Sequence, residues 1–266
     1  MLNRWIEKRF ELPKIDVPDL RHVGDPEAAA DALRRLWGIG EMPIRNMVHL
    51  LESRGVRLFS LSIESKEVDA FSMWSADTPI IMLNNFKSAE RSRFDAAHEL
   101  GHLVLHRHGA KNSNRLLEAQ ADAFASAFLM PSRSMKACAP KFATINSLIS
   151  LKRDWGVSLA ALNVRLHKVE AISEWHYKSL CMDIGKRGFR TQEPDEANRE
   201  SSAVLQAILR DLYQNDGLSK GDIAKELSVP VDEIDALLFG LTLHGIQGNR
   251  QGPAPQPMNV GLTRIK

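Results

Sequence analysis

Residues Phe94–His102 read FDAAHELGH, and this stretch says more about the fold than any other in the chain. Its two histidines, His98 and His102, stand four residues apart, and Glu99 follows the first directly. On an α-helix, positions four apart lie on one face about a turn from each other, so both imidazoles can bind a single ion. A glutamate in this position can reach a water molecule on that ion and act as its general base. The stretch therefore predicts a helix that carries a catalytic zinc site with Glu99 as base.

A catalytic zinc site uses three protein ligands, and two residues are candidates for the third. His108 lies six residues after the second histidine, but Leu105 stands where the extended motif has a glycine that turns the chain back toward the metal. Glu118 lies in the next helical stretch, RLLEAQADAFASAFLM (115–130), four residues before Asp122. We expect Glu118 to bind the ion, and Asp122 to lie behind it and accept a hydrogen bond from a ligand histidine.

The second helical stretch has an apolar stripe beside these two acids. Its members recur at helical spacing, which is typical of a buried helix face: Leu117, Ala121, Phe124, Ala125 and Phe128. Gln120 points elsewhere and receives no role. His106, one turn beyond the motif, is expected to be exposed or hydrogen-bonded behind a ligand rather than to bind the metal itself.

The composition is that of an ordinary globular protein. The 266 residues are 44% hydrophobic and 26% charged, and the formal net charge of +2 is too small to indicate a nucleic-acid surface by itself. The two cysteines, Cys138 and Cys181, have no metal-ligand spacing and no disulfide framework, which fits a reducing cytoplasm. We find neither a signal peptide nor an apolar stretch long enough to cross a membrane, so we expect a cytoplasmic protein with no membrane association.

The chain is expected to fold as an α+β protein, with a mostly helical domain around the predicted zinc site, a small three-stranded sheet and a small all-α C-terminal domain. The predicted parts are an N-terminal arm (1–25), the domain with the zinc site (26–190), a helix-turn-helix-like domain (195–245) and a flexible tail (246–266). Three runs rich in β-branched or aromatic residues predict the strands: VRLFSLS (56–62), VDAFSMW (68–74) and PIIMLN (79–84).

The third of these strands offers a route to substrate capture. If PIIMLN lies at the edge of the sheet, its free backbone groups can pair with an extended peptide. It can equally be a central strand, and the sequence leaves both arrangements open. The sequence also offers four candidates for stabilising an oxyanion, which it cannot rank: Arg165, His167, His176 and Tyr177.

Four segments in this order resemble the ImmA/IrrE family of metallopeptidases, over roughly residues 28 to 190. They are PIIMLNN (79–85), RSRFDAAHELGHLVLHRH (91–108), LEAQADAFASAFLMPSRSM (117–135) and WGVSLAALNVRLHKVEAISE (155–174). The resemblance implies a compact zincin-like domain in which His98, His102 and Glu118 bind Zn²⁺ and Glu99 is the base. It also implies a role in bacterial or phage regulation, by cleaving or antagonising a helix-turn-helix repressor. Many members carry a DNA-binding domain at their own N-terminus, but only about 25 residues precede this domain here, so we expect the repressor to be a separate polypeptide.

The segment GLSKGDIAKELSVPVDEIDALLFG (217–240) has the rhythm of a helix-turn-helix, with a break at Val229 and Pro230. Its second helix carries Asp232, Glu233 and Asp235 and no lysine or arginine, which disfavours contact with phosphates. Two functions therefore stand as alternatives to a narrow-specificity zinc endopeptidase. One is a non-proteolytic regulator or toxin–antitoxin component that uses the zincin-like fold for binding, and the other is a DNA-binding regulator acting through the C-terminal helices.

Overall fold

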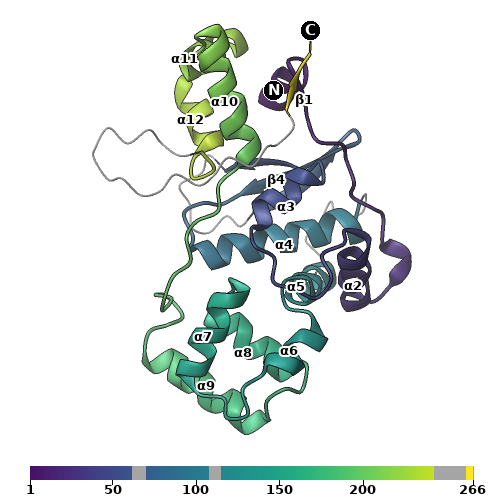
Figure 1. Ribbon diagram of the computed structural model, residues 1–266, viewed down its shortest axis with the longest axis vertical. Helices are drawn as coiled ribbons and strands as arrows, with labels where there is room; N and C mark the ends of the chain where they lie inside the picture. The colour runs from purple at the N-terminus through teal and green to yellow at the C-terminus, as the bar shows by residue number, and fades with distance from the viewer. Residues whose placement is uncertain (62–69, 108–114, 243–261, 266) are drawn as a thin grey trace. The chain divides into compact units, whose positions relative to one another are not determined.

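The computed structural model describes residues 1–61, 70–107, 115–242 and 262–265. Within these ranges the protein is mostly helical with a small sheet, which confirms the predicted α+β class (Figure 1). The described residues divide into two compact units that do not follow the order of the chain. Unit 1 comprises residues 1–17, 48–86 and 200–266, and unit 2 comprises residues 18–47 and 87–199.

These units cut across the consecutive domains expected from the sequence. The N-terminal segment and the C-terminal helices belong to the same unit, because residues far apart in the chain pack together there. The boundaries 1–25, 26–190, 195–245 and 246–266 stay a prediction. Most of the expected flexible tail lies outside the described residues. Within it, however, Thr263–Arg264 form a short strand, β5, that pairs antiparallel with β1 (Phe10–Glu11) in unit 1.

The three-stranded sheet of unit 1 contains β2 (Arg57–Ser60), β3 (Phe71–Ser75) and β4 (Thr78–Leu83). Its order is β2-β4-β3, with β4 parallel to β2 and antiparallel to β3. The strand predicted from PIIMLN is therefore central and not an edge. Because its backbone groups pair with both neighbours, the idea that this strand captures an extended peptide is wrong. Residues 62–69, which include the start of the second predicted strand, lie outside the described residues.

Helices supply the rest of unit 1. They are α1 (Leu2–Glu7), α3 (Met47–Ser53), α10 (Ala203–Asp216), α11 (Lys220–Leu227) and α12 (Val231–Leu238). The predicted break between the last two is present, since Ser228, directly after α11, has the left-handed conformation and Pro230 precedes α12. Leu2, Trp5 and Ile6 of α1 are buried, so the N-terminal segment packs into the unit.

Unit 2 is built around α2 (Pro26–Leu36), α4 (Ala89–Leu105) and α5 (Arg115–Leu129), and α5 packs against both others. Asp25 caps α2 and accepts a hydrogen bond from the backbone N–H of Ala28. Four further helices follow in this unit (Figure 1): α6 (Ser132–Cys138), α7 (Ile145–Trp155), α8 (Leu159–Lys168) and α9 (Glu174–Lys186).

The apolar stripe predicted on α5 forms the core of unit 2. Ala121, Phe124, Ala125 and Phe128 are fully buried, whereas Leu117, the first member of the stripe, is only half-buried. Phe124 and Phe128 stack on each other with ring centroids 5.5 Å apart. This core holds α4 and α5 against each other, and these are the two helices that carry the predicted metal ligands.

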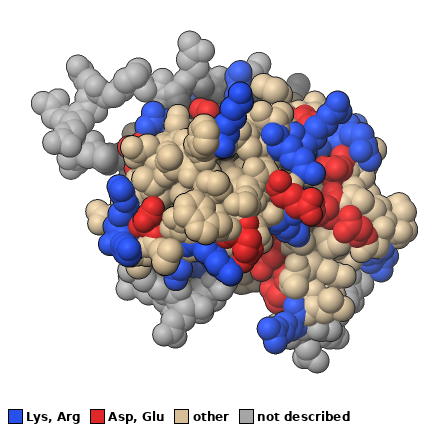
Figure 2. Space-filling view, turned by 90° about the horizontal axis from the view of Figure 1, so that it is seen from below, with Lys and Arg blue, Asp and Glu red and all other residues tan. Residues whose placement is uncertain are grey.

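The surface has no dominant charge on the face shown in Figure 2. Blue lysine and arginine side chains alternate there with red aspartate and glutamate side chains around an uncharged area. This mixture agrees with the small formal net charge of +2. Among the described residues, the helices lack the combination of length and hydropathy that crossing a membrane requires.

Candidate metal centre

Helix α4 places both histidines of the motif on one face. It begins after Ser88, a capping serine whose side chain accepts a hydrogen bond from the backbone N–H of Arg91. His98 and His102 follow one turn apart, with ring centroids 4.8 Å from each other. Both rings are largely shielded, with side-chain exposures of 16% and 15%.

Helix α5 approaches α4 closely where Gly101 lies between the two histidines. A Cβ atom at Gly101 would lie 3.0 Å from Cδ1 of Phe124 and 3.3 Å from Cα of Ala121. Both distances are shorter than an ordinary van der Waals contact between carbon atoms. The glycine therefore allows the two helices to pack close enough for a side chain of α5 to reach the histidine rings.

Two buried arginines fix the other end of α5. Arg34 of α2 donates a hydrogen bond to the carbonyl oxygen of Phe128, and Nε of Arg165 donates one to the carbonyl oxygen of Met130 at 2.8 Å. The last carbonyl groups of a helix have no partner within the helix, so these bonds satisfy them. Because both guanidinium groups are almost fully buried, the position of α5 is tied to α2 and α8.

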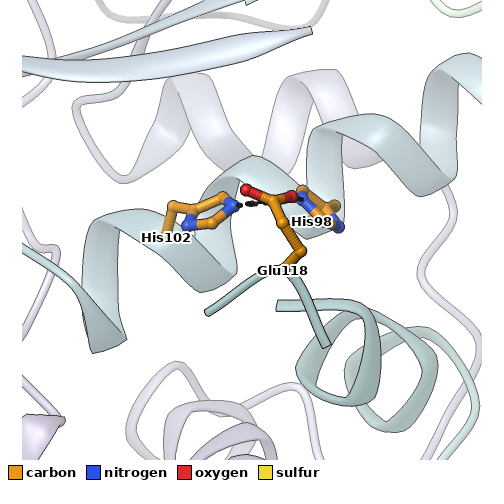
Figure 3. A group of neighbouring side chains, drawn as sticks. All are labelled: His98, His102 and Glu118. Carbon is orange, nitrogen blue, oxygen red and sulfur yellow. Dashed lines mark hydrogen bonds and ion pairs between the residues drawn. The ribbon is translucent and has the colours of Figure 1, made fainter. Parts of the chain in front are cut away.

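His98, His102 and Glu118 converge on one point (Figure 3). The Nε2 atoms of the two histidines are 3.1 Å apart. Oε2 of Glu118 lies 3.2 Å from Nε2 of His98 and 3.6 Å from Nε2 of His102. Tetrahedral ligands about 2.1 Å from a zinc ion are separated from one another by about 3.4 Å. The three observed separations lie close to this value, so the residues present fit a tetrahedral metal ion with its fourth position open.

The far side of the His98 ring is held by Asp122. Its Oδ1 atom lies 2.8 Å from Nδ1 of His98. An aspartate carboxylate only accepts hydrogen bonds, so Nδ1 carries a proton and Nε2 is the ring nitrogen that faces Glu118. The structure thus brings Asp122 to the place that the sequence predicted for it, behind a histidine.

The charges around the rings set their pKa values apart. Burial lowers the pKa of His98, but the hydrogen bond with Asp122 and the charges of Glu99, Asp122 and Glu118 outweigh it and raise that pKa overall. Burial, together with the neighbouring His98, lowers the pKa of His102 to about 4. The protein therefore holds His102 as a neutral imidazole at neutral pH, which is the form that binds a metal.

The group of three residues could hold a metal ion, and its donors are two imidazoles and one carboxylate. This donor set suits a catalytic zinc site. Glu99 is buried beside the group, since only 6% of it is exposed. The proximity of its charge contributes to the raised pKa of His98. The parts assigned to these residues from the sequence, ligands for His98, His102 and Glu118 and base for Glu99, stay predictions.

The remaining histidines of this region differ in their surroundings. His108 lies outside the described residues. His106 forms hydrogen bonds through both ring nitrogens, from Nδ1 to Nδ1 of His102 at 2.9 Å and from Nε2 to Oε1 of Gln120 at 3.0 Å. Sequence reasoning allowed for a bonded His106 but gave Gln120 no role. The four-residue spacing of His102 and His106 does indicate a contact between these two residues, because it places both rings on one helix face.

The four candidates for an oxyanion donor make other contacts. Arg165 bonds to Glu27 and Met130, His167 bonds to Glu174 and stacks on Tyr177, and His176 bonds to Ser173. These contacts connect α8 and α9 with their neighbours. We assign none of the four the oxyanion role.

Comparison with known proteins identifies one family. Residues 51–167 match the model of the peptidase M78 family, described as the IrrE N-terminal-like domain. No curated protein matches the chain. Among solved structures, a Mycobacterium tuberculosis transcriptional regulator is similar at 16% sequence identity and a TM-score of 0.37. The matched part covers 53% of this chain and 46% of the regulator, so the chain spans about half of that protein's length.

The matched residues 51–167 lie inside the region that resembles the ImmA/IrrE family in sequence, and they include the motif helix, Glu118 and Asp122. Residues 51–167 thus form an IrrE N-terminal-like domain of the peptidase M78 family, which supports the resemblance to the ImmA/IrrE family.

Proposed function

We propose that the protein is a zinc-dependent endopeptidase of narrow specificity that cleaves a regulatory protein. The observation that carries this proposal is the convergence of Nε2 of His98, Nε2 of His102 and Oε2 of Glu118 within 3.6 Å of one another. Three groups that present lone pairs at such short range repel each other unless a proton or a cation lies between them. Membership in a peptidase family favours a metal ion in that place.

Each residue then has a definite part in hydrolysis. His98, His102 and Glu118 would hold the ion, and Asp122 would orient the ring of His98. A zinc ion bound in such a site would lower the pKa of water toward neutrality and polarise a carbonyl group. Glu99 would take a proton from water and return it to the leaving amine.

The centre is open enough for a protein substrate. The side chains of Glu118 and Asp122 are 46% and 62% exposed, although the histidine rings beside them are shielded. A peptide can therefore reach the group from the side of α5. A structural metal site is closed by four protein ligands, which would leave no such approach.

We propose a helix-turn-helix transcriptional repressor, supplied as a separate polypeptide, as the substrate. This proposal follows the regulatory role that the family resemblance implies. It places the enzyme in a reducing cytoplasm, in line with the free thiols of Cys138 and Cys181.

The charges of the C-terminal helices favour contact with a protein over binding to DNA. Helix α12, the second helix of the helix-turn-helix-like segment, presents Asp232 and Glu233 at its start and no basic side chain. Lys220, at the start of α11, is paired with Asp235 of α12 at 2.7 Å. A helix with this charge repels phosphates.

The test uses the zinc-loaded protein and a panel of purified helix-turn-helix repressors. We expect the wild type to release fragments of one repressor or a few, detected by mass spectrometry. Glu99→Gln should bind the same amount of zinc but cleave at a rate lower by about 10²- to 10⁴-fold, because the general base is lost. Glu118→Ala should lose both zinc and cleavage.

Two outcomes would contradict the proposal. If Glu99→Gln cleaves as fast as the wild type, the residue is not the base and the fragments come from other chemistry. If a repressor is bound and inactivated without any fragment, the protein is a non-proteolytic binding module.

A further inference from the structure

Three side chains form a hydrogen-bonded chain that leads away from the predicted metal centre. Nδ1 of His102 lies 2.9 Å from Nδ1 of His106, and Nε2 of His106 lies 3.0 Å from Oε1 of Gln120. His106 follows directly after α4, and its backbone N–H bonds to the carbonyl oxygen of His102. Gln120 belongs to α5, two residues after Glu118. These hydrogen bonds therefore connect the end of α4 to α5.

The donor and the acceptor of each of these hydrogen bonds follow from the amide group of Gln120. The amide oxygen of Gln120 can only accept a hydrogen bond, so Nε2 of His106 donates. A neutral imidazole carries one proton, so Nδ1 of His106 is an acceptor. Nδ1 of His102 must then donate to it, which leaves the lone pair of His102 on Nε2. That is the atom that faces His98 and Glu118.

We propose that His106 and Gln120 are positioning residues that fix the tautomer and the ring orientation of His102 for metal binding. This inference rests on the proposed metal site. Histidines that bind a metal donate their other ring N–H to an acceptor that orients the ring. Asp122 provides that acceptor for His98, and the pair of His106 and Gln120 provides it for His102.

The same bonds explain why His106 is not a fourth ligand. Its Nδ1 accepts from His102, and its Nε2 donates to Gln120, so neither ring nitrogen has a lone pair left for a metal. A zinc ion bound by His98, His102 and Glu118 would therefore keep its fourth position for water, as hydrolysis requires.

The test measures Zn²⁺ affinity of the full chain by competition with a chromophoric chelator. His106→Leu fills similar space but cannot accept from His102, and we expect it to bind Zn²⁺ about 10- to 100-fold more weakly. Gln120→Leu should weaken binding in the same direction, by several-fold. His106→Asn retains an acceptor near Nδ1 and Gln120→Glu retains one for Nε2, so both should stay within a few-fold of the wild type. His176→Leu is the matched control, because it removes a histidine ring that bonds to Ser173 and not to the predicted metal centre.

A second measurement reports the tautomers without any metal. Nitrogen-15 NMR of the histidine rings should show His102 protonated at Nδ1 and His106 at Nε2 in the wild type. Gln120→Leu should remove the preference of His106 for that form. Spectra of Co²⁺-loaded protein should show a shifted ligand-field band in His106→Leu and an unchanged one in His176→Leu.

The outcomes separate this inference from the proposed function. If the wild type binds Zn²⁺ and His106→Leu, folded to the same thermal midpoint, binds it equally well, the positioning role is refuted while the metal site stands. If His106→Asn loses as much affinity as His106→Leu, the effect is one of packing and the hydrogen-bond chain is likewise refuted. If the wild type binds no Zn²⁺, both the site and its positioning residues are refuted. If the variants show the expected Zn²⁺ affinities but the wild type cleaves no repressor, the positioning role is supported and only the proposed peptidase activity is contradicted.

Discussion

Asp122 lies directly behind His98, with its Oδ1 atom 2.8 Å from the Nδ1 atom of the ring. The two residues come from different helices, α5 and α4, and Asp122 stands one turn after Glu118, which contacts the opposite nitrogen of the same ring. One face of α5 thus holds His98 from both sides. This relationship gives the first of four predictions.

Asp122→Ala should weaken Zn²⁺ binding by about 10- to 100-fold, because the acceptor that orients His98 is lost. Asp122→Asn keeps a hydrogen-bond acceptor but not the charge. Its Zn²⁺ affinity should lie between those of the alanine variant and the wild type. Chelator competition measures both. Asp154→Ala, which removes an exposed aspartate from α7, is the control and should bind as the wild type does. Unchanged affinity in Asp122→Ala would show that the contact does not support the site.

Gly101→Ala should destabilise the protein, although alanine favours helices. The added methyl group would lie 3.0 Å from Cδ1 of Phe124, a fully buried ring that cannot move freely. Overpacking of this kind costs about 1–3 kcal/mol, against a gain in helix propensity of about 1 kcal/mol. We expect a net loss of about 1 kcal/mol in urea unfolding, together with weaker Zn²⁺ binding, since α5 must move away from α4.

Gly185→Ala is the matched control for that substitution. Gly185 is also helical, in α9, but a methyl group added there would have no atom within 4 Å apart from its own neighbours in the chain and helix. The variant should therefore gain roughly 0.5 kcal/mol of stability from helix propensity. Two glycine-to-alanine changes with the same sign of effect would contradict the close approach of α4 and α5 at Gly101.

Lys152→Met should unfold far more easily than the wild type. The ammonium group of Lys152 is 1% exposed and pairs with Glu90 of α4 at 2.8 Å and with Glu193 at 3.2 Å. Removing it leaves two buried carboxylates without their counter-charge, which costs about 3–5 kcal/mol.

The neighbouring ion pair tests the reason for this effect. Arg153 and Asp195 pair at 2.5 Å, but their side chains are 66% and 50% exposed. Arg153→Met should therefore change the free energy of unfolding by less than about 1 kcal/mol. Similar losses in the two variants would show that burial is not what makes the Lys152 pair important.

Glu52 should make stability fall as pH rises through neutrality. Burial raises its pKa from 4.5 to about 7, although the Ser202 hydroxyl and the backbone N–H groups of Val204 and Ala203 donate to it and lower the pKa in part. Since the folded-state pKa lies above the unfolded value, the folded protein binds the proton more tightly between pH 4.5 and pH 7. The stabilisation is complete below pH 4.5 and is lost as the pH passes 7, a change of about 3 kcal/mol.

The measurement is urea unfolding of the wild type and of Glu52→Gln from about pH 4.5 to about pH 8, which spans both pKa values. Other groups titrate in the same window, so the informative quantity is the difference between the two proteins. We expect the variant to gain stability relative to the wild type as pH rises. A constant difference over this range would mean that Glu52 has an ordinary pKa.

Much of the candidate site could be predicted because its components are local. The four-residue spacing of His98 and His102 places their rings together on any α-helix, and Ser88 marks where that helix begins. Glu118 and Asp122 repeat the same spacing on α5. Once the apolar stripe is taken to face α4, the acids beside it have the histidines as neighbours.

Other residues of the site and of the surrounding core could not be predicted from their neighbours in the sequence. Gln120 reaches His106 only because α5 crosses near the end of α4, and nothing in its sequence neighbourhood distinguishes it from a surface glutamine. Lys152 is equally ordinary in sequence, yet it is buried between Glu90 and Glu193. A side chain's burial depends on which surfaces meet in space, and periodicity within one helix does not contain that information.

The sequence by itself determined the helix that carries His98 and His102, the apolar stripe of α5, the three strands and the break before α12, because backbone geometry and hydrogen bonds within a few residues decide these features. Only the tertiary structure decided that β4 lies between β2 and β3, and that the N-terminal segment joins the C-terminal helices in one unit. Strand order and unit boundaries arise from pairings between residues far apart in the chain. Any strand has two edges and any helix several faces, so the partner of each is set by the packing of the whole unit.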